Sequence, residues 1–413
     1  MRRFWVMGLG MALLCVLTPS VATAQQGVPQ TDGVRFGAFS IHPSMYTAVR
    51  YVDNIYFVPN DYAPQTPESV PQGKESDYIL NVQPGTIIQF RVPNFRAQAD
   101  YRFYNDTYLG TDDEDDLHSQ LDASNHNFGG AMEYQAPIGV FANVRDQYTV
   151  QETFEDSDQF IDQIRGDQER NEGSATLGYR YGPEDNLYIA GRYTNVLDIY
   201  ENPDISDRWA WYGDGDFRLK FLPQTAILVQ GGYGEVYYNK WLETDVKCAN
   251  SFMTFGQAGL AGQLTNHIRV LAKAGYQANE YECGESFDGP IGQLEFAGNW
   301  QNVTRFSVGY RRQILDAATT NFFESDEVYL TAYRLWFDRL ASDLFASYQF
   351  NEFSNPNDRH EDFIQVKFDL TMELIAWLYF GGGYQYDNLY FDDGDLNNTT
   401  ERNTFLVKLL AQF

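Results

Sequence analysis

The feature that most constrains this fold is a two-residue alternation of apolar and polar side chains, repeated along most of the chain. In "IRVLAKAGYQAN" (residues 268–279), Val270 falls on one face and Arg269 on the other. Residues 96–105 and 343–351 alternate in the same way. Period two predicts strands with one apolar and one polar face. These runs extend over roughly 10–14 residues, longer than the five or six usual in globular sheets.

The connections between the alternating runs fall into two classes, which themselves alternate along the chain. Short turns are predicted near Pro93-Asn94, Ala136-Pro137, Pro183 to Asn186, Leu222 to Gln224, Thr265-Asn266, Gln301-Asn302, Asp338-Arg339 and Met372-Glu373. Longer acidic segments, such as "TDDEDDLHSQLD", separate them. Eight short turns and nine long loops make 17 connections and therefore 18 strands. No linker divides this array of hairpins into domains.

Long alternating strands with short turns at one end and long polar loops at the other are typical of outer-membrane barrels. Backbone groups in hydrocarbon need internal hydrogen bonds, so a sheet there has to close on itself. The 30 Phe, 29 Tyr and 7 Trp residues suit aromatic girdles at the two interfaces. We therefore predict an all-β fold, a transmembrane antiparallel up-and-down β-barrel of about 18 strands. A soluble, secreted multi-sandwich protein is the alternative, but its strands would be shorter and its turns would not sort into two length classes.

The N-terminus has the pattern of a secretory signal peptide. Arg2 and Arg3 precede an apolar run from Val6 to Leu17, and Ala22-Thr23-Ala24 follows. The apolar run is too short to span a bilayer as a helix. We predict a signal peptide over residues 1–24, a periplasmic segment over 25–34, a barrel over 35–413, and localisation in the cell outer membrane of a Gram-negative bacterium.

The formal charge of −28 argues against a nucleic-acid partner, which requires a basic face. Most acids lie in the predicted loops, whereas basic residues repeatedly take the polar, lumen-facing side of the strands. The predicted lumen-lining set is Arg102, Arg145, Arg180, Arg192, Arg218, Lys220, Arg269, Lys273, Arg305, Arg311, Lys367 and Lys408. These cations either pair with luminal acids such as Asp100 and Asp369, or they leave a field that favours anions.

The acidic loops and the cysteines are the candidates for a metal site and a disulfide. The acidic run 112–116 lacks the spacing of a calcium-binding loop, so we predict a solvated loop there, with a loose divalent bridge to lipid head groups as the alternative. No metal site is predicted. Cys248 and Cys283 flank the hairpin of residues 252–281 on its loop side, and the periplasm permits oxidation. We predict a structural disulfide between them.

No catalytic motif is present in the sequence. The five histidines, His42, His118, His126, His267 and His360, fall on different predicted hairpins. There is no Gly-x-Ser-x-Gly elbow and no His-Glu-x-x-His sequence. We therefore expect neither catalytic residues nor a cofactor, and the protein is predicted not to be an enzyme.

The C-terminal stretch "TFLVKLLAQF" is compatible with both a helical and a strand period. The preceding hairpins favour a strand, because the last strand has to pair with the first to close the barrel. Phe405, Val407 and Leu409 would then meet lipid, and Lys408 would face the lumen. The terminal Phe413 resembles the aromatic signal that the outer-membrane assembly machinery recognises.

Residues 35–110 resemble the β-barrel porin 2 family of outer-membrane proteins. The shared features are Phe36-Gly37-x-Phe39, Pro43-Ser44, Tyr51-x-Asp53-Asn54-x-Tyr56, Ser76-Asp77, Pro84-Gly85 and the strand carrying Tyr101, Tyr104 and Tyr108. The chain departs from the family at Val52, where relatives often have an acid. The resemblance implies export of exopolysaccharide or capsular polysaccharide together with a periplasmic polysaccharide-export protein.

The leading functional expectation is therefore an outer-membrane channel for polysaccharide export. A passive diffusion porin for small, anionic solutes is the main alternative, and a purely structural barrel is another. The expected partners are outer-membrane lipid and lipopolysaccharide, the assembly machinery, the periplasmic export protein and the polysaccharide substrate.

Overall fold

The computed structural model describes residues 33–55, 57, 74–110, 122–151, 168–182, 185–200, 207–238, 250–282, 285–301, 303–316, 322–354, 359–392 and 397–413. Every regular element among them is a strand. The strands are β1 (Val34–Phe36), β2 (Phe39–Val52), β3 (Asp77–Val92), β4 (Phe95–Tyr108), β5 (Ala123–Gln135), β6 (Val140–Gln151), β7 (Gln168–Tyr181), β8 (Leu187–Tyr200), β9 (Arg208–Leu222), β10 (Thr225–Tyr238), β11 (Asn250–Gln263), β12 (Ile268–Tyr281), β13 (Phe287–Trp300), β14 (Thr304–Asp316), β15 (Phe322–Trp336), β16 (Leu340–Phe353), β17 (His360–Ile375), β18 (Leu378–Asp392) and β19 (Asn397–Gln412).

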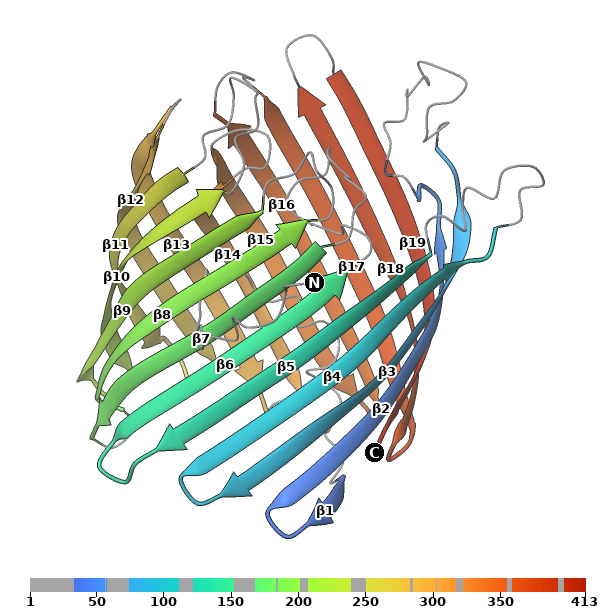
Figure 1. The fold of residues 1–413 in the computed structure, drawn as a ribbon, viewed down its shortest axis with the longest axis horizontal. Helices are drawn as coiled ribbons and strands as arrows, with labels where there is room; N and C mark the ends of the chain where they lie inside the picture. Colours follow the sequence, from blue (N-terminus) through green and yellow to red (C-terminus); the bar gives the residue numbers. More distant parts are fainter. Residues whose placement is uncertain are drawn as a thin grey trace, which may run out of the picture.

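The strands β2 to β19 form one closed antiparallel barrel (Figure 1). Each pairs with the next along the chain, and β19 pairs with β2 from Thr404–Val52 to Gln412–Ser44. The short β1 adds to β2 alone and was not predicted. Of the 19 strands, 18 therefore make the barrel, which confirms the predicted architecture and strand number. Among the described residues there is no helix long and apolar enough to cross a bilayer.

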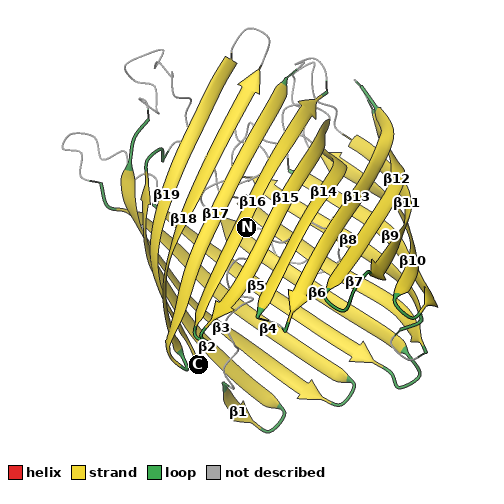
Figure 2. Ribbon diagram, turned by 180° about the vertical axis from the view of Figure 1, so that it is seen from behind, coloured by secondary structure: helices red, strands yellow, loops and turns green. Residues whose placement is uncertain are grey.

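The connections sort into two ends of the barrel, as the sequence predicted. All eight short turns lie at the end that also carries β1 and the C-terminus (Figures 1 and 2). Pro93 and Asn94 link β3 to β4, and Asn94 has the positive φ of 70° that a type II turn places after its proline. The predicted turn at Met372-Glu373 was wrong in position. Strand β17 continues to Ile375 through a register shift, and the turn falls at the apolar pair 376–377, where neither glycine nor proline marks it.

The outer surface of the barrel is apolar between two aromatic belts. At the short-turn end, the ring of Trp377 stacks on that of Phe413 at 4.9 Å between centroids, and Trp300 stacks on Phe306 at 5.4 Å. Towards the loop end, outward tyrosines donate hydrogen bonds to outward carboxylates. These pairs are Tyr148–Glu169 (2.9 Å), Tyr276–Asp288 (2.7 Å), Tyr310–Asp326 and Tyr348–Asp362 (2.8 Å).

The strand β13 illustrates the distance between these belts. From Trp300 to Asp288, its outward positions are occupied by Gly298, Phe296, Leu294, Gly292 and Pro290. These five outward positions carry no charge, and the span is slightly longer than the 9–11 tilted residues that cross a bilayer. An apolar band flanked by aromatic residues matches the outer surface of membrane barrels.

The C-terminal strand has the face that the strand period predicted. Phe405, Val407 and Leu409 are exposed, whereas Lys408 and Leu410 are buried on the opposite side. The C-terminal stretch is therefore a strand and not a helix, as part of β19, which runs from Asn397 to Gln412. The Phe413 amide donates to the carbonyl of Pro43 at 3.0 Å, so the final residue is tied to the first barrel strand.

Several predictions fall outside the described residues. The signal peptide of residues 1–24 and the segment up to residue 32 belong to this group, as do the acidic run 112–116 and His118. Cys248 and Cys283 also lie outside the described residues, so their disulfide stays a prediction.

Candidate functional site

The candidate functional site is the lumen, which is defined by the strand faces opposite the exposed apolar residues. On β7, Leu177, Tyr179 and Tyr181 are exposed, whereas Gln168 and Ser174 on the other face are buried. The same alternation continues around the barrel, so inward positions carry most of the buried polar side chains. A barrel of 16–18 strands is wide enough to leave an aqueous channel instead of a core filled by side chains.

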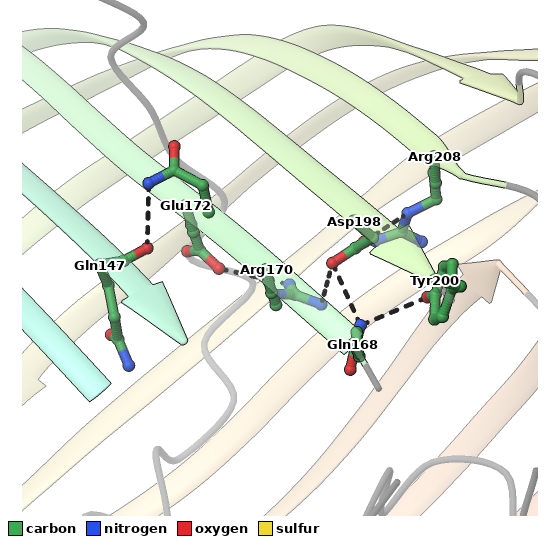
Figure 3. A network of polar contacts seen from close by, with 8 residues as sticks. Gln147, Gln168, Arg170, Glu172, Asp198, Tyr200 and Arg208 are labelled. Carbon is green, nitrogen blue, oxygen red and sulfur yellow. Dashed lines mark hydrogen bonds and ion pairs between the residues drawn. The ribbon is translucent and has the colours of Figure 1, made fainter. Parts of the chain in front are cut away.

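The clearest luminal feature is a buried carboxylate held by two arginines, Asp198 on β8 with Arg170 and Arg208 (Figure 3). The Asp198 carboxylate is 1% exposed. Arg208 Nε donates to it at 3.1 Å, an Arg170 guanidinium nitrogen lies 3.5 Å away, and Gln168 adds a bond of 3.3 Å. Burying a charge is costly unless it is paired and hydrogen-bonded, and here both conditions are met.

Similar pairs recur around the loop-end half of the lumen. Arg402 donates twice to the fully buried Asp387, at 3.1 and 3.0 Å, and Gln365 donates to the same carboxylate at 2.8 Å. Further pairs are Arg50–Asp106 (2.7 Å), Arg311–Glu327 (2.5 Å) and Arg359–Glu361. Small apolar clusters, such as Val196, Ala210 and Val236, lie between these pairs. In this part of the lumen wall, these arginines are therefore neutralised by neighbouring carboxylates.

Three of the twelve predicted luminal cations are held tightly by acids. Arg192 lies between Asp214 at 3.7 Å and Asp216 at 3.0 Å. Arg311 pairs with Glu327, and Lys408 pairs with Asp369 at 2.5 Å. For these residues the pairing alternative describes the lumen, because each charge is neutralised by a neighbour.

Five of the other predicted cations have weaker partners or aromatic neighbours. Arg145 lies 4.0 Å from Glu133, while Arg180 and Arg218 share Asp185 at 4.0 and 3.8 Å. Arg102 donates to the Tyr104 hydroxyl at 3.4 Å, and the Arg305 guanidinium lies 4.3 Å from the centre of the Tyr333 ring. The remaining four occupy inward positions on their strands: Lys220 on β9, Arg269 and Lys273 on β12, and Lys367 on β17. Several of these weakly held cations lie near the short-turn end.

Sequence reasoning missed several luminal arginines, for two different reasons. Arg170 lies in the wholly polar run "QERNEG", where no apolar residue marks the outward face. Arg91 and Arg96 flank a correctly predicted turn at Pro93-Asn94. That turn sets the hairpin register and therefore places the two arginines opposite each other, a signal that was available from the sequence.

The described histidines lie apart from one another. His42 hydrogen-bonds Ser40 at 2.9 Å, His126 hydrogen-bonds Tyr101 at 3.0 Å, His267 stacks on Trp300, and His360 stacks on Phe350. Within the part of the chain that the structure describes, no group of three potential metal ligands occurs.

Comparisons with known proteins give only distant structural likenesses. No protein-family model and no curated protein sequence matches the chain. Among solved structures it is similar to OccAB3 of Acinetobacter baumannii, with 11% identity over 92% of this chain and 100% of that one, at a TM-score of 0.47.

Two further structures are similar to the same degree. The outer membrane protein OpdK of Pseudomonas aeruginosa has 10% identity over 91% of this chain and 99% of that one, at a TM-score of 0.48. The siderophore receptor PirA of Acinetobacter baumannii has 8% identity over 93% and 81%, at 0.49. We draw no conclusion about function from likenesses of this strength. The barrel implied by the family resemblance of residues 35–110 is confirmed by the structure, whereas the family's link to polysaccharide export stays a prediction.

Proposed function

We propose that the protein is an outer-membrane channel through which small polar solutes diffuse. The observation that carries this proposal is the sorting of side chains on the two surfaces of a closed 18-strand barrel. Exposed Leu, Val and Phe side chains cover the outside, whereas Arg, Asp, Gln and Asn line the inside. Such a surface is stable only with lipid outside and water or polar groups inside.

The two aromatic belts support a defined orientation in the membrane. Short turns face the periplasm and longer loops face the exterior in bacterial barrels of this kind. Trp377 and Phe413 would then lie at the periplasmic interface, and the Tyr–carboxylate pairs at the outer one. The outer-membrane location is part of the proposal and follows from the same surface pattern.

Liposome swelling tests the channel directly. Proteoliposomes that contain the purified barrel should swell in solutions of small neutral sugars, at rates that fall as sugar size increases. Protein-free liposomes are the control. Swelling no faster than in the control would contradict a diffusion channel.

Export of a polysaccharide is the second candidate, supported by the resemblance of residues 35–110 and by aromatic rings on the luminal face. Tyr333 and Phe345 lie on inward positions of β15 and β16, where flat rings can pack against sugar rings. An exporter should be closed to small sugars in the liposome assay. Deletion of its gene should remove surface polysaccharide, and an unchanged polysaccharide coat would contradict export.

A further inference from the structure

A cavity of about 340 Å³ lies at the short-turn rim of the lumen, between β3, β4, β5, β6 and β7. Three arginines, Arg91, Arg96 and Arg180, contribute to its lining. Phe141, Asn143 and Gln135 complete the inward part of the wall. Its volume is at the lower end of the range for small-ligand pockets.

Two of these arginines form an unfavourable pair in the absence of a ligand. Arg91 on β3 and Arg96 on β4 lie directly opposite each other in the antiparallel ladder, with both side chains on the inward face. Like charges in directly opposed positions destabilise a strand pair. Within the described residues no carboxylate forms an ion pair with either one, in contrast to Asp198 or Asp387 higher in the lumen, each held by arginine.

The third arginine is held in place by aromatic packing and not by a strong ion pair. The Arg180 guanidinium lies 4.5 Å from the centre of the Phe141 ring, and Phe141 stacks on Tyr188 at 5.5 Å. Its nearest carboxylate, Asp185, is 4.0 Å away and is shared with Arg218. The Nε atom of Arg180 is buried and makes no hydrogen bond with the described residues. Stacking therefore orients a guanidinium whose Nε donor has no partner among the described residues.

One carboxylate, that of Glu133, also lines the cavity, and its negative charge would repel an anion. Glu133 lies opposite Arg96 in the ladder and 4.0 Å from Arg145. Arg145 therefore offsets it at least in part, and the three lining arginines remain in excess. Arginine is suited to this role because its planar donors match the oxygens of carboxylate and phosphate groups.

We propose that this rim pocket binds the oxyanion group of a small solute, a carboxylate or a phosphate, through Arg91, Arg96 and Arg180. The inference rests on the proposed channel function and adds a substrate class to it. Because the short turns face the periplasm, the pocket would capture anions at the periplasmic mouth. In the loop-end half of the lumen, by contrast, Arg208, Arg311 and Arg402 are each paired with a carboxylate.

Block of the ionic current measures this binding. The intact protein is inserted into a planar bilayer, and inorganic phosphate, glucuronate or neutral glucose is added to the short-turn side at constant ionic strength. Phosphate or glucuronate should reduce the current, and glucose should not. The concentration for half-maximal block should rise at least about tenfold in the Arg91→Gln/Arg96→Gln double variant, because at least one charged hydrogen bond is lost.

The matched control is Arg269→Gln. Arg269 is an exposed, inward-facing arginine near the same end, on β12, and does not line the cavity. Its replacement should change the half-blocking concentration less than about twofold, because only the general field changes. Equal shifts in the control and in the double variant would overturn the pocket and leave a simple charge effect.

The two proposals can fail separately. Steady current with no block by phosphate or glucuronate would refute the pocket and leave the channel intact. If no current flows, calorimetric titration of inorganic phosphate into the folded protein still decides the inference. Heat of binding that is lost in the double variant would support the pocket, and an absence of binding heat in the original protein would overturn it.

Discussion

The Lys408 ammonium nitrogen lies 2.5 Å from a carboxylate oxygen of Asp369, although the two residues are on strands that are not neighbours. Lys408 is on β19 and Asp369 on β17, and the lysine reaches across Gly381 of the intervening β18. Thr371 donates to the same carboxylate at 2.9 Å. Asp343 faces Asp369 directly across the ladder on the other side, so the charge of Lys408 also offsets the repulsion between the two acids.

Loss of the lysine should therefore destabilise the barrel. Lys408→Met leaves the half-buried Asp369 opposite Asp343 without its cation, and we expect the free energy of unfolding to fall by up to about 3–5 kcal/mol. Urea titration of the folded protein in detergent micelles measures the change. The Lys408→Met/Asp369→Leu double variant is the control, because replacing both partners by apolar groups should restore most of the loss. A double variant as weak as the single one would contradict this account.

Gly381, which lies between Lys408 and Asp369, should not accommodate a side chain without cost. A Cβ atom at Gly381 would lie 2.4 Å from the Leu370 carbonyl oxygen and 2.8 Å from Lys408 Cε. Gly381→Ala should cost about 1–3 kcal/mol, as overpacking usually does. Gly191→Ala on β8 is the matched control, since nothing lies within 4 Å of a Cβ there. Equal unfolding midpoints for the two variants would show that the close approach is relieved without cost.

The strand face of the C-terminal stretch predicts that a charge on its outward side is far more costly than the same charge on its inward side. Val407 is 56% exposed in the middle of the outward apolar band, and Val407→Arg should cost about 2–4 kcal/mol in lipid vesicles. Thr404→Arg places the same charge on the inward face of β19 and should have a much smaller effect. Comparable losses at the two positions would contradict a lipid-facing outer surface.

Phe413 packs on Trp377, and its predicted role as an assembly signal can be tested separately from this packing. Removal of its ring or that of Trp377 abolishes the 4.9 Å stack, so each alanine variant should lose about 0.5–1.5 kcal/mol of stability. If Phe413 is also the assembly signal, only Phe413→Ala should lower the amount of folded protein in the outer membrane. Quantitative blotting of membrane fractions compares the two. Equal amounts of both variants would leave Phe413 with the packing role alone.

The sequence was most informative where apolar residues mark one face of a strand. Tyr179 and Tyr181 flank Arg180, and their alternation was enough to place the arginine inward. The short turns were also located correctly, with the exception of residues 376–377, whose apolar side chains carry no turn signal. The alternation and the turns are both local patterns of the sequence. Counting them gives the strand number, and a sheet of this kind in a membrane has to close.

Specific luminal ion pairs could not be predicted from the sequence when a long loop connects the two strands that carry them. Arg170 lies opposite Asp198 across a short turn, where the turn sets the register. The partnership of Asp198 with Arg208 depends on the register of β8 against β9, which a longer connection separates. The Lys408–Asp369 pair depends on the registers of three strands, β17, β18 and β19, and on the glycine at position 381 in the middle strand. Such contacts are properties of the assembled sheet.

Single-channel recording in a planar lipid bilayer tests the central claim most directly. The purified barrel, added without any partner protein in potassium chloride solution, should produce discrete, long-lived steps of conductance. Heat-unfolded protein at the same concentration is the control. A bilayer that contains the folded barrel and yet shows no current above the control would contradict a diffusion channel.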